Sequence, residues 1–358
     1  MEKIKINLQL FAQGAGDVVN TTAGHVNAYN GTANATGALN PTIKTFYDTE
    51  LLENARIEML YGQFAKKQPL PRGNGRTIEW RKWNTFAKAT ELQEGVIPSG
   101  QTFGMTSITD SIKQYGTYAA VSDVLELHAY DPIILGATEE MGASAAETQE
   151  TLIRNALLNG TNVVYCDNVT LSSGAVSQAK SCAEMEASET VLAKLTPAMV
   201  NKVATHLKKN KVPRINGKYV AVVHPSVAED LRNSKEWLEA HKYASPEEIF
   251  LGEIGELHGV RFIENPFAPV LKGGDYANKQ GTATYATYFF GKDAFGIVDP
   301  EGGALEMIIK DKSQVGGPLN QFSTIGYKFE TNGAKVLYTE RLVRVMSCST
   351  YSAIDEAN

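Results

Sequence analysis

The chain has 358 residues, a formal net charge of -6, 21% charged residues and 43% hydrophobic residues. This apolar content can fill sizeable cores, so global disorder is excluded, and the length predicts two or three subdomains. The acidic balance disfavours a protein whose main task is to neutralise nucleic-acid phosphates, because such proteins carry a basic footprint.

The N-terminal stretch is predicted to be an arm. From Met1 to Ala12, apolar residues alternate with Lys, Asn and Gln, which favours a short strand over a signal peptide. Residues 12–41 are rich in Gly, Ala, Asn and Thr and cannot offset their ordering entropy within one subunit. We therefore expect residues 1–41 to gain order only against partners. No run of about 18 apolar residues occurs in the sequence, which excludes a membrane span.

A helix followed by a long ribbon is predicted next. From Thr42 the apolar residues recur near helical spacing, which predicts about four helical turns closed by Pro69 and Pro71. Residues 77–83 and 107–121 have strand character, and polar, glycine-bearing segments flank and separate them. We interpret residues 70–120 as a two-stranded excursion. Because such a ribbon is only marginally stable alone, we expect it to lie on another surface.

The clearest helix is predicted over residues 131–159. Asp131 can serve as N-cap, Pro132 as the first helical residue, and Gly160 ends the pattern. A narrow apolar stripe runs along this segment, and its Glu residues lie largely outside the stripe. Such a helix would measure about 40 Å, which suits a spine crossing a flat subunit better than a compact globule.

The rest of the chain is predicted to alternate helix and strand and then to become mainly strand. Residues 161–190 are expected to form a surface excursion. An α/β subdomain is predicted from a helix capped at Thr196, a strand at 219–223, a helix at 226–233 and a strand at 259–264. Further strands are predicted at 284–290, 305–310, 323–330 and 334–346.

No pattern for catalysis or metal binding stands out in the sequence. Four histidines lie close together along the chain, at His206, His224, His241 and His258. They lack the HxxxH and HExxH spacings of metal sites, so we interpret them as structural or exposed. The three cysteines form no ligand cluster and are interpreted as reduced thiols. A GxSxG elbow and a phosphate loop are absent from the sequence, and we predict no catalytic, cofactor or metal site.

The predicted ribbon interleaves basic and aromatic side chains. The candidate contact residues are Arg72, Arg76, Trp80, Arg81, Trp83 and Phe86. Such a set could stack on single-stranded nucleic acid, but Arg and aromatic side chains also dominate protein interfaces. We favour the interface and hypothesise that the ribbon overlaps a neighbouring subunit and supplies much of the assembly energy. Charge reversal at Arg76 and Arg81 should then abolish particles while the subunit stays folded.

Several segments, in the same order, resemble the tailed-phage major capsid proteins related to the coat protein of phage N-four. The matching residues are Val223–Pro225 with Asp230–Arg232, Ile249–Pro266 with its Gly-Glu-Ile-Gly and Gly-Val-Arg strings, Phe290–Gly296, and Gly317–Gln321 with Gly326–Lys328. The resemblance spans roughly residues 40 to 348. It departs from the family pattern at Gly316–Gly317, where an acidic residue is expected before Pro318.

The resemblance implies an α+β chain with the Johnson fold of tailed-phage shells. The implied parts are an N-terminal arm at 1–41, a peripheral domain at 42–194 with the spine helix at 131–159 and the extended loop at about 70–120, an axial domain at 195–280, and return strands of the peripheral domain with a C-terminal tail at 281–358. The implied function is that of a major capsid protein that self-assembles as pentamers and hexamers into an icosahedral head shell.

The partners implied by the resemblance are further copies of the chain, scaffold, portal and decoration proteins, and packaged double-stranded DNA without sequence-specific binding. The resemblance also implies synthesis in the bacterial host cytoplasm, location in the virion capsid, no cofactor and no membrane. An encapsulin-like protein compartment or another phage structural protein is the second hypothesis. A cytoplasmic α/β enzyme is the third, because no catalytic constellation stands out.

Overall fold

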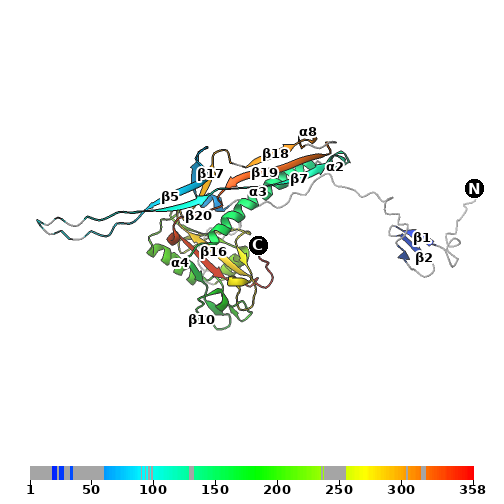
Figure 1. The fold of residues 1–358 in the computed structure, drawn as a ribbon. Helices are drawn as coiled ribbons and strands as arrows, with labels where there is room; N and C mark the ends of the chain where they lie inside the picture. The colour runs from blue at the N-terminus through cyan, green and yellow to red at the C-terminus, as the bar shows by residue number, and fades with distance from the viewer. Residues whose placement is uncertain are drawn as a thin grey trace, which may run out of the picture. The chain divides into compact units, whose positions relative to one another are not determined.

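The computed structural model divides the chain into two units, Met1–Ala55 and Arg56–Asn358. It describes the backbone of residues 18–21, 24–27, 33–34 and 133–135, and the full residues 60–89, 91–92, 94–95, 97, 100–128, 136–234, 237, 255–303, 305–315 and 320–358. In the first unit, β1 (Val18–Thr21), β2 (Gly24–Asn27) and β3 (Ala33–Asn34) form an antiparallel sheet (Figure 1). These strands were not predicted from the sequence. The remainder of the arm and the part of the predicted helix before residue 60 lie outside the described residues.

The second unit is built around a mixed sheet with strand order β13–β14–β12–β16–β21–β8, and β15 pairs with β16. Its strands are β8 (Val163–Tyr165), β12 (Tyr219–Val223), β13 (Glu256–Leu257), β14 (Val260–Glu264), β15 (Val270–Leu271), β16 (Thr284–Phe290) and β21 (Leu342–Ser347). The β12–β14 and β21–β8 pairs are parallel. Every residue of β12, β16 and β21 is buried, which explains why β12 and β16 appear in the sequence as short apolar runs.

Helices cover both faces of this central sheet. One face packs against α4 (Pro197–Lys209) and α5 (Pro225–Arg232), which bury residues such as Val200 and Leu231 in one core. The Thr196 hydroxyl caps α4 by accepting the Met199 N–H at 3.3 Å, as the sequence predicted. The opposite face packs against α1 (Tyr61–Phe64) and the C-terminal part of α3 (Ile133–Leu158). The central sheet is therefore the middle of three layers.

The predicted spine helix is confirmed as α3, and its expected cap Asp131–Pro132 lies outside the described residues. The middle of α3 packs against a second sheet, of order β18–β19–β7, through Ala145, Tyr327 and Phe329. The elements of this outer sheet and its end are β7 (Lys113–Ser122), α2 (Asp123–His128), β18 (Glu306–Lys310), α8 (Lys312–Val315) and β19 (Phe322–Thr331). Figure 1 shows α3 running alongside β7 and β19. One helix thus joins two sheets.

Smaller elements complete the second unit. Two three-stranded sheets are formed by β4 (Lys66–Leu70), β17 (Phe295–Pro300) and β20 (Lys335–Val336), and by β9 (Asn168–Thr170), β10 (Val176–Ser177) and β11 (Val191–Leu192). The remaining elements are the ribbon of β5 (Thr77–Trp83) and β6 (Met105–Ser111), and the 3-10 turns η3 (Cys182–Glu184), η4 (Gly274–Tyr276) and η5 (Thr339–Arg341). Within the described ranges, no helix has both the length and the apolar content needed to cross a bilayer.

Two predicted strands are wrong in their extent. Residues 107–121 do not form one strand of the ribbon, because the chain changes sheet at Ile112: β6 pairs with β5, whereas β7 pairs with β19. Residues 334–346 do not form one strand either, because η5 separates β20, which pairs with β17, from β21, which pairs with β16. In both cases continuous β character along the chain conceals a change of pairing partner.

Three further differences arise from tertiary contacts. The helix predicted to close at Pro69 and Pro71 has ended by Phe64, and Pro69 lies in the edge strand β4 opposite Asp299, a position where a missing N–H is tolerated. Residues 161–190 are more than a surface excursion, because β8 joins the central sheet and Met185 is fully buried. The boundary expected at residue 280 falls between two strands that pair with each other, β15 and β16. The strand β17 was not predicted.

A glycine substitution tests the packing of the outer sheet. A Cβ at Gly326 would lie 2.8 Å from both the Thr117 carbonyl oxygen and the Tyr118 Cβ. We expect Gly326→Ala to push β19 and β7 apart and to lower the free energy of unfolding by about 1 to 3 kcal/mol, measured by thermal denaturation. Gly142→Ala is the control, because its Cβ meets no described atom within 4 Å and Ala is favoured inside a helix. Unchanged stability of the Gly326→Ala protein would contradict the expectation.

Candidate functional site

The candidate site is the ribbon of β5 and β6, which projects from the second unit (Figure 1). The two strands pair continuously from Thr77 opposite Ser111 to Trp83 opposite Met105. The burial of β5 alternates, so that Ile78 and Trp80 face the body of the unit while the odd-numbered residues are exposed. This period-2 pattern divides the ribbon into a face that is fixed to its own subunit and a face that is open.

The ribbon base is an apolar cluster within the subunit. It consists of Ile78, Trp80, Ile112, Val298 and Leu337. Trp80 is 8% exposed. A Cβ added at Gly296 would lie only 3.1 Å from the edge of the Trp80 ring. Gly296 therefore permits the close approach of the indole to β17. Burial of a Trp side chain is among the largest single apolar contributions available to a core.

Polar contacts hold the ribbon base as well. The Asn332 amide donates to Asp110 Oδ2 at 2.9 Å, and its oxygen accepts the Val298 N–H at 2.9 Å. Lys82 Nζ lies 3.6 Å from Glu340 Oε1 and 4.7 Å from the centroid of the Tyr338 ring. Because this ion pair is partly exposed, it contributes at most about 1 kcal/mol. The apolar cluster is the main attachment of the ribbon.

The ribbon tip, residues 83–105, carries exposed apolar side chains. Trp83 is 65% exposed and Ile97 is 94% exposed. Phe103 contacts both Trp83 and Phe86, with ring centroids 5.5 Å and 5.9 Å apart. Leu92 and Met105 are also exposed among the residues of the tip that the structure describes. A clustered, exposed aromatic group of this kind marks a protein interaction surface.

The predicted contact residues do not form one surface. Trp80 belongs to the ribbon base, whereas Trp83 and Phe86 lie exposed at the ribbon tip. Arg81 is exposed, and its Nε lies 3.5 Å from Glu79 Oε1 on the same strand. Arg76 is exposed where the ribbon begins, and its carbonyl accepts the Ile112 N–H at 2.9 Å.

Arg72 lies before the ribbon, beside the turn that follows β17. Its backbone N–H donates to Glu301 Oε2 at 3.4 Å, and its guanidinium lies over Gly302, where a Cβ would come within 2.7 Å of it. Four exposed residues of the tip were not among the predicted contact residues, because they are scattered through a polar, glycine-bearing stretch: Leu92, Ile97, Phe103 and Met105. The one signal for them in the sequence is that they are large apolar side chains in an otherwise polar segment, which has too few apolar residues to bury them within itself.

A second exposed apolar surface lies on the outer sheet. Tyr118 is 74% exposed and Phe322 is 50% exposed, and a shallow groove of about 440 Å³ runs between β7, β19 and β18. Leu127 on the adjoining α2 is exposed too. The second unit therefore presents one apolar surface at the ribbon tip and another on its outer sheet.

No constellation for covalent or metal chemistry accompanies these surfaces. Within the described part of the chain, no group of three or more His, Cys, Asp or Glu side chains could hold a metal ion. His224 caps α5 by accepting the Ser226 N–H at 3.3 Å, and His206 contacts the Asn210 amide at 3.1 Å. His241 lies outside the described residues. The three cysteines are free and buried, and burial raises the pKa of the Cys166 thiol well above its ordinary value.

A pair of tryptophan variants separates the ribbon base from the ribbon tip. Trp80→Ala should leave a cavity in the base cluster and lower the free energy of unfolding by about 3 to 5 kcal/mol. Trp83→Ala should change it by less than about 0.5 kcal/mol, because the side chain is exposed in the subunit. Chemical denaturation of both purified proteins measures the difference. Equal losses would show that the two indoles are not divided in this way.

Comparison with known proteins identifies the fold and the family. The sequence matches the family model described as phage capsid protein over residues 107–332. The capsid of cyanophage Pam1 has a similar structure, with a TM-score of 0.66, 14% identity, and coverage of 90% of this chain and 100% of that chain. The head structure of Helicobacter pylori bacteriophage KHP40 matches with a TM-score of 0.64, 11% identity, and coverage of 88% and 99%. No curated protein matches the sequence.

At these identities the structural likeness shows the fold, and the family rests on the match over residues 107–332. The α+β phage-capsid fold expected from the sequence is confirmed. The chain belongs to the phage capsid protein family: it is a major capsid protein, a structural subunit that forms the phage head shell, and not an enzyme.

Proposed function

We propose that the ribbon tip is the element by which each subunit overlaps its neighbour in the shell. The observation that carries this proposal is the contrast between the buried Trp80 at the base and the exposed Trp83 and Phe103 at the tip. An aromatic side chain buries about 150 to 250 Å² when it is covered. A ribbon that is anchored at one end and apolar at the other can therefore deliver that burial to another subunit.

The receiving surface proposed here is the outer sheet of the neighbouring copy. Its support is the groove between β7, β19 and β18, which Tyr118 and Ile308 line, together with the exposed Phe322, which lies on the same face of β19 as Gly326 in the groove. Tip and groove lie on different parts of one subunit, so their contact is heterologous. A heterologous contact generates a ring when the rotation between copies closes, as a pentamer or hexamer requires.

Shell closure requires one chain to fit slightly different surroundings in pentamers and hexamers. A two-stranded ribbon is only marginally stable alone, so the tip can adjust its direction while the base stays fixed. We assign α3 and the outer sheet to the peripheral domain, and the central sheet with α4 and α5 to the axial domain. This assignment places β16 and β21 in the axial domain, because they pair within its sheet. Residues 1–41 remain assigned to an arm that contacts neighbouring copies.

The shell is proposed to confine double-stranded DNA without reading its sequence. The formal net charge of -6 supports confinement rather than tight phosphate binding. Scaffold, portal and decoration proteins are the further partners proposed, and synthesis is assigned to the bacterial host cytoplasm. The finished protein belongs to the virion capsid.

Removal of the tip aromatics tests the overlap. A Trp83→Ser and Phe103→Ser double variant should fold with unchanged thermal stability but form no shells, because its assembly contact loses its apolar area. Sedimentation and negative-stain electron microscopy measure assembly. Ile354→Ser is the control, because Ile354 is also exposed but lies in the C-terminal tail, and this variant should assemble normally. Normal shells from the double variant would refute the role of the ribbon tip.

The content of the particles separates a viral shell from an encapsulin-like compartment. Particles purified from infected cells should retain double-stranded DNA after nuclease treatment, since a closed shell excludes the enzyme. Extraction and gel analysis of the protected nucleic acid measure the outcome, with particles opened by heat before nuclease treatment as the control. Intact particles that contain protein cargo and no DNA would favour the compartment.

A further inference from the structure

Glu150 on α3 forms a buried joint between three parts of the second unit. Glu150 is buried, with only 1% of its surface exposed. Its Oε1 accepts three hydrogen bonds: from the Leu60 N–H at 2.9 Å, the Tyr61 N–H at 3.1 Å and the Asn265 side-chain amide at 3.1 Å. One carboxyl oxygen therefore holds the start of α1, the spine helix and the loop after β14 together. We call these four residues the Glu150 joint.

The second carboxyl oxygen has a different environment. Glu150 Oε2 is buried and has no hydrogen-bond partner among the described residues. An ionised carboxylate would leave part of its charge on this oxygen without a donor from the described residues, which is costly in a protein interior. A protonated carboxyl group avoids most of that cost, because the proton resides on Oε2 while Oε1 still accepts N–H groups.

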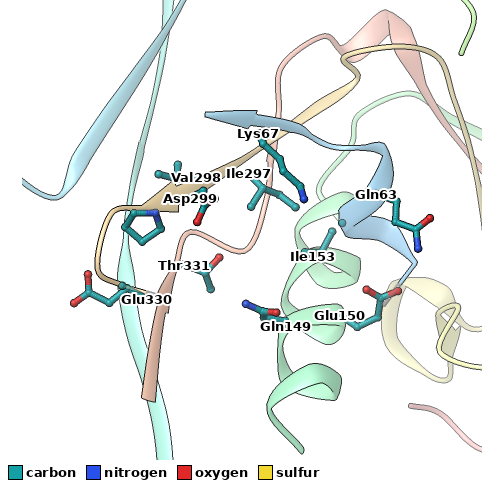
Figure 2. A pocket seen from close by; sticks show the side chains of 13 residues that line it. Gln63, Lys67, Gln149, Glu150, Ile153, Ile297, Val298, Asp299, Glu330 and Thr331 are labelled. Carbon is teal, nitrogen blue, oxygen red and sulfur yellow. The ribbon is translucent and has the colours of Figure 1, made fainter. Parts of the chain in front are cut away.

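The charged groups around the joint do not neutralise Glu150. Glu150 and Lys67 line one pocket of about 270 Å³, together with Asp299 of β17 and Glu330 of β19. Figure 2 shows these side chains. Within the described residues, no cation lies within 4 Å of Glu150. The next basic group along α3, Arg154, donates instead to Asn358 Oδ1 at 2.8 Å.

The aromatic groups beside the joint remain neutral. Burial raises the pKa of the Tyr61 hydroxyl well above its ordinary value. Burial also raises the pKa of Tyr288 on β16, whose ring lies 6.0 Å from that of Tyr61 and whose hydroxyl donates to the Arg154 carbonyl at 2.9 Å. The raised pKa values of these tyrosines leave Glu150 as the group, among the joint and its immediate aromatic neighbours, whose charge responds to pH below the range in which tyrosine ionises.

We propose that Glu150 is a proton-controlled latch: the protonated side chain closes the joint between α1, α3 and the Asn265 loop, and ionisation loosens it. Loosening releases the backbone amides of Leu60 and Tyr61 from the spine helix. The latch connects the beginning of the described second unit to the helix that carries the outer sheet. It is a conformational device within the subunit, and it does not depend on the overlap proposed for the ribbon tip.

The direction of the pH effect follows from the environment of the carboxyl group. Desolvation by burial raises the pKa of Glu150, and the hydrogen bonds from Tyr61, Leu60 and Asn265 lower it by less. A carboxyl group whose pKa is raised in the closed joint binds protons there more tightly than when it is solvated. The stabilisation is then fully present below the ordinary pKa of Glu, and it is lost as the pH rises through the raised value.

The test compares Glu150→Gln with wild type in assembled shells of the full chain. Gln keeps an acceptor at Oε1 and cannot ionise, so the joint should stay closed at every pH. Hydrogen exchange of the Leu60 and Tyr61 amides, divided by the intrinsic rate at each pH, should accelerate severalfold from pH 5 to pH 8 in wild type. In Glu150→Gln the ratio should stay constant. Glu147→Gln is the control, because Glu147 is exposed on the same helix, and it should follow wild type.

An identical pH profile in wild type and Glu150→Gln would overturn the proposal. A second measurement covers the case in which Glu150→Gln does not fold. Wild-type protein with carbon-13 in its glutamate carboxyl groups should show, by nuclear magnetic resonance, one carboxyl that titrates above the ordinary range of Glu. If every glutamate titrates within the ordinary range, the proposal fails. If ribbon-tip variants assemble normally, the proposed function fails, but the Glu150 proposal is still tested. Both of its measurements follow groups inside the subunit and do not depend on the ribbon-tip contact.

Discussion

The packing of α3 against two different sheets is the constraint on which the rest of the second unit depends. Its C-terminal part buries Ile153 and Leu157 against the central sheet, while Ala145 contacts Tyr327 and Phe329 of the outer sheet. The stripe of small and medium side chains along α3 allows both sheets to approach the helix closely. Without that helix, the two sheets would share few apolar contacts and could not present their surfaces in a fixed relation.

This arrangement explains how a protein without reaction chemistry can have a defined function. The apolar base fixes the ribbon to its own subunit through Trp80 and Val298, whereas the tip exposes Trp83 and Phe103. Exposed aromatic area is costly for a solitary protein in water and favourable once a second surface covers it. A shell subunit needs this asymmetry, because its folding and its assembly draw on separate apolar groups.

One buried polar group makes the packing of the second unit dependent on pH. Thr196 closes the N-terminus of α4 as a cap, whereas Glu150 places a titratable carboxyl group where three elements meet. Its two oxygens have opposite environments, one with three donors and one without a partner among the described residues. A buried acid of this kind couples the geometry of a joint to the proton concentration. The interior of the second unit is thus rigid, but the rigidity of the Glu150 joint depends on the charge of its carboxyl group.

The sequence by itself determined the elements whose signals are local. The spine helix, the capped helix α4 and the buried strands β12 and β16 were predicted because caps, apolar stripes and apolar runs belong to neighbouring residues. The ribbon was recognised from its basic and aromatic residues, and Trp83 and Phe86 do lie at its exposed tip. The scattered apolar residues of the tip had no periodicity and were missed.

Only the tertiary structure decided which strands pair and which faces are buried. The division of residues 107–121 between β6 and β7 depends on partners such as Phe322–Thr331, and Trp80 is buried because Val298 and Leu337 reach it from distant parts of the chain. Local periodicity specifies that a residue has a buried face, but it carries no information about the partner that buries it. That partner is set by contacts between residues more than two hundred positions apart in the sequence.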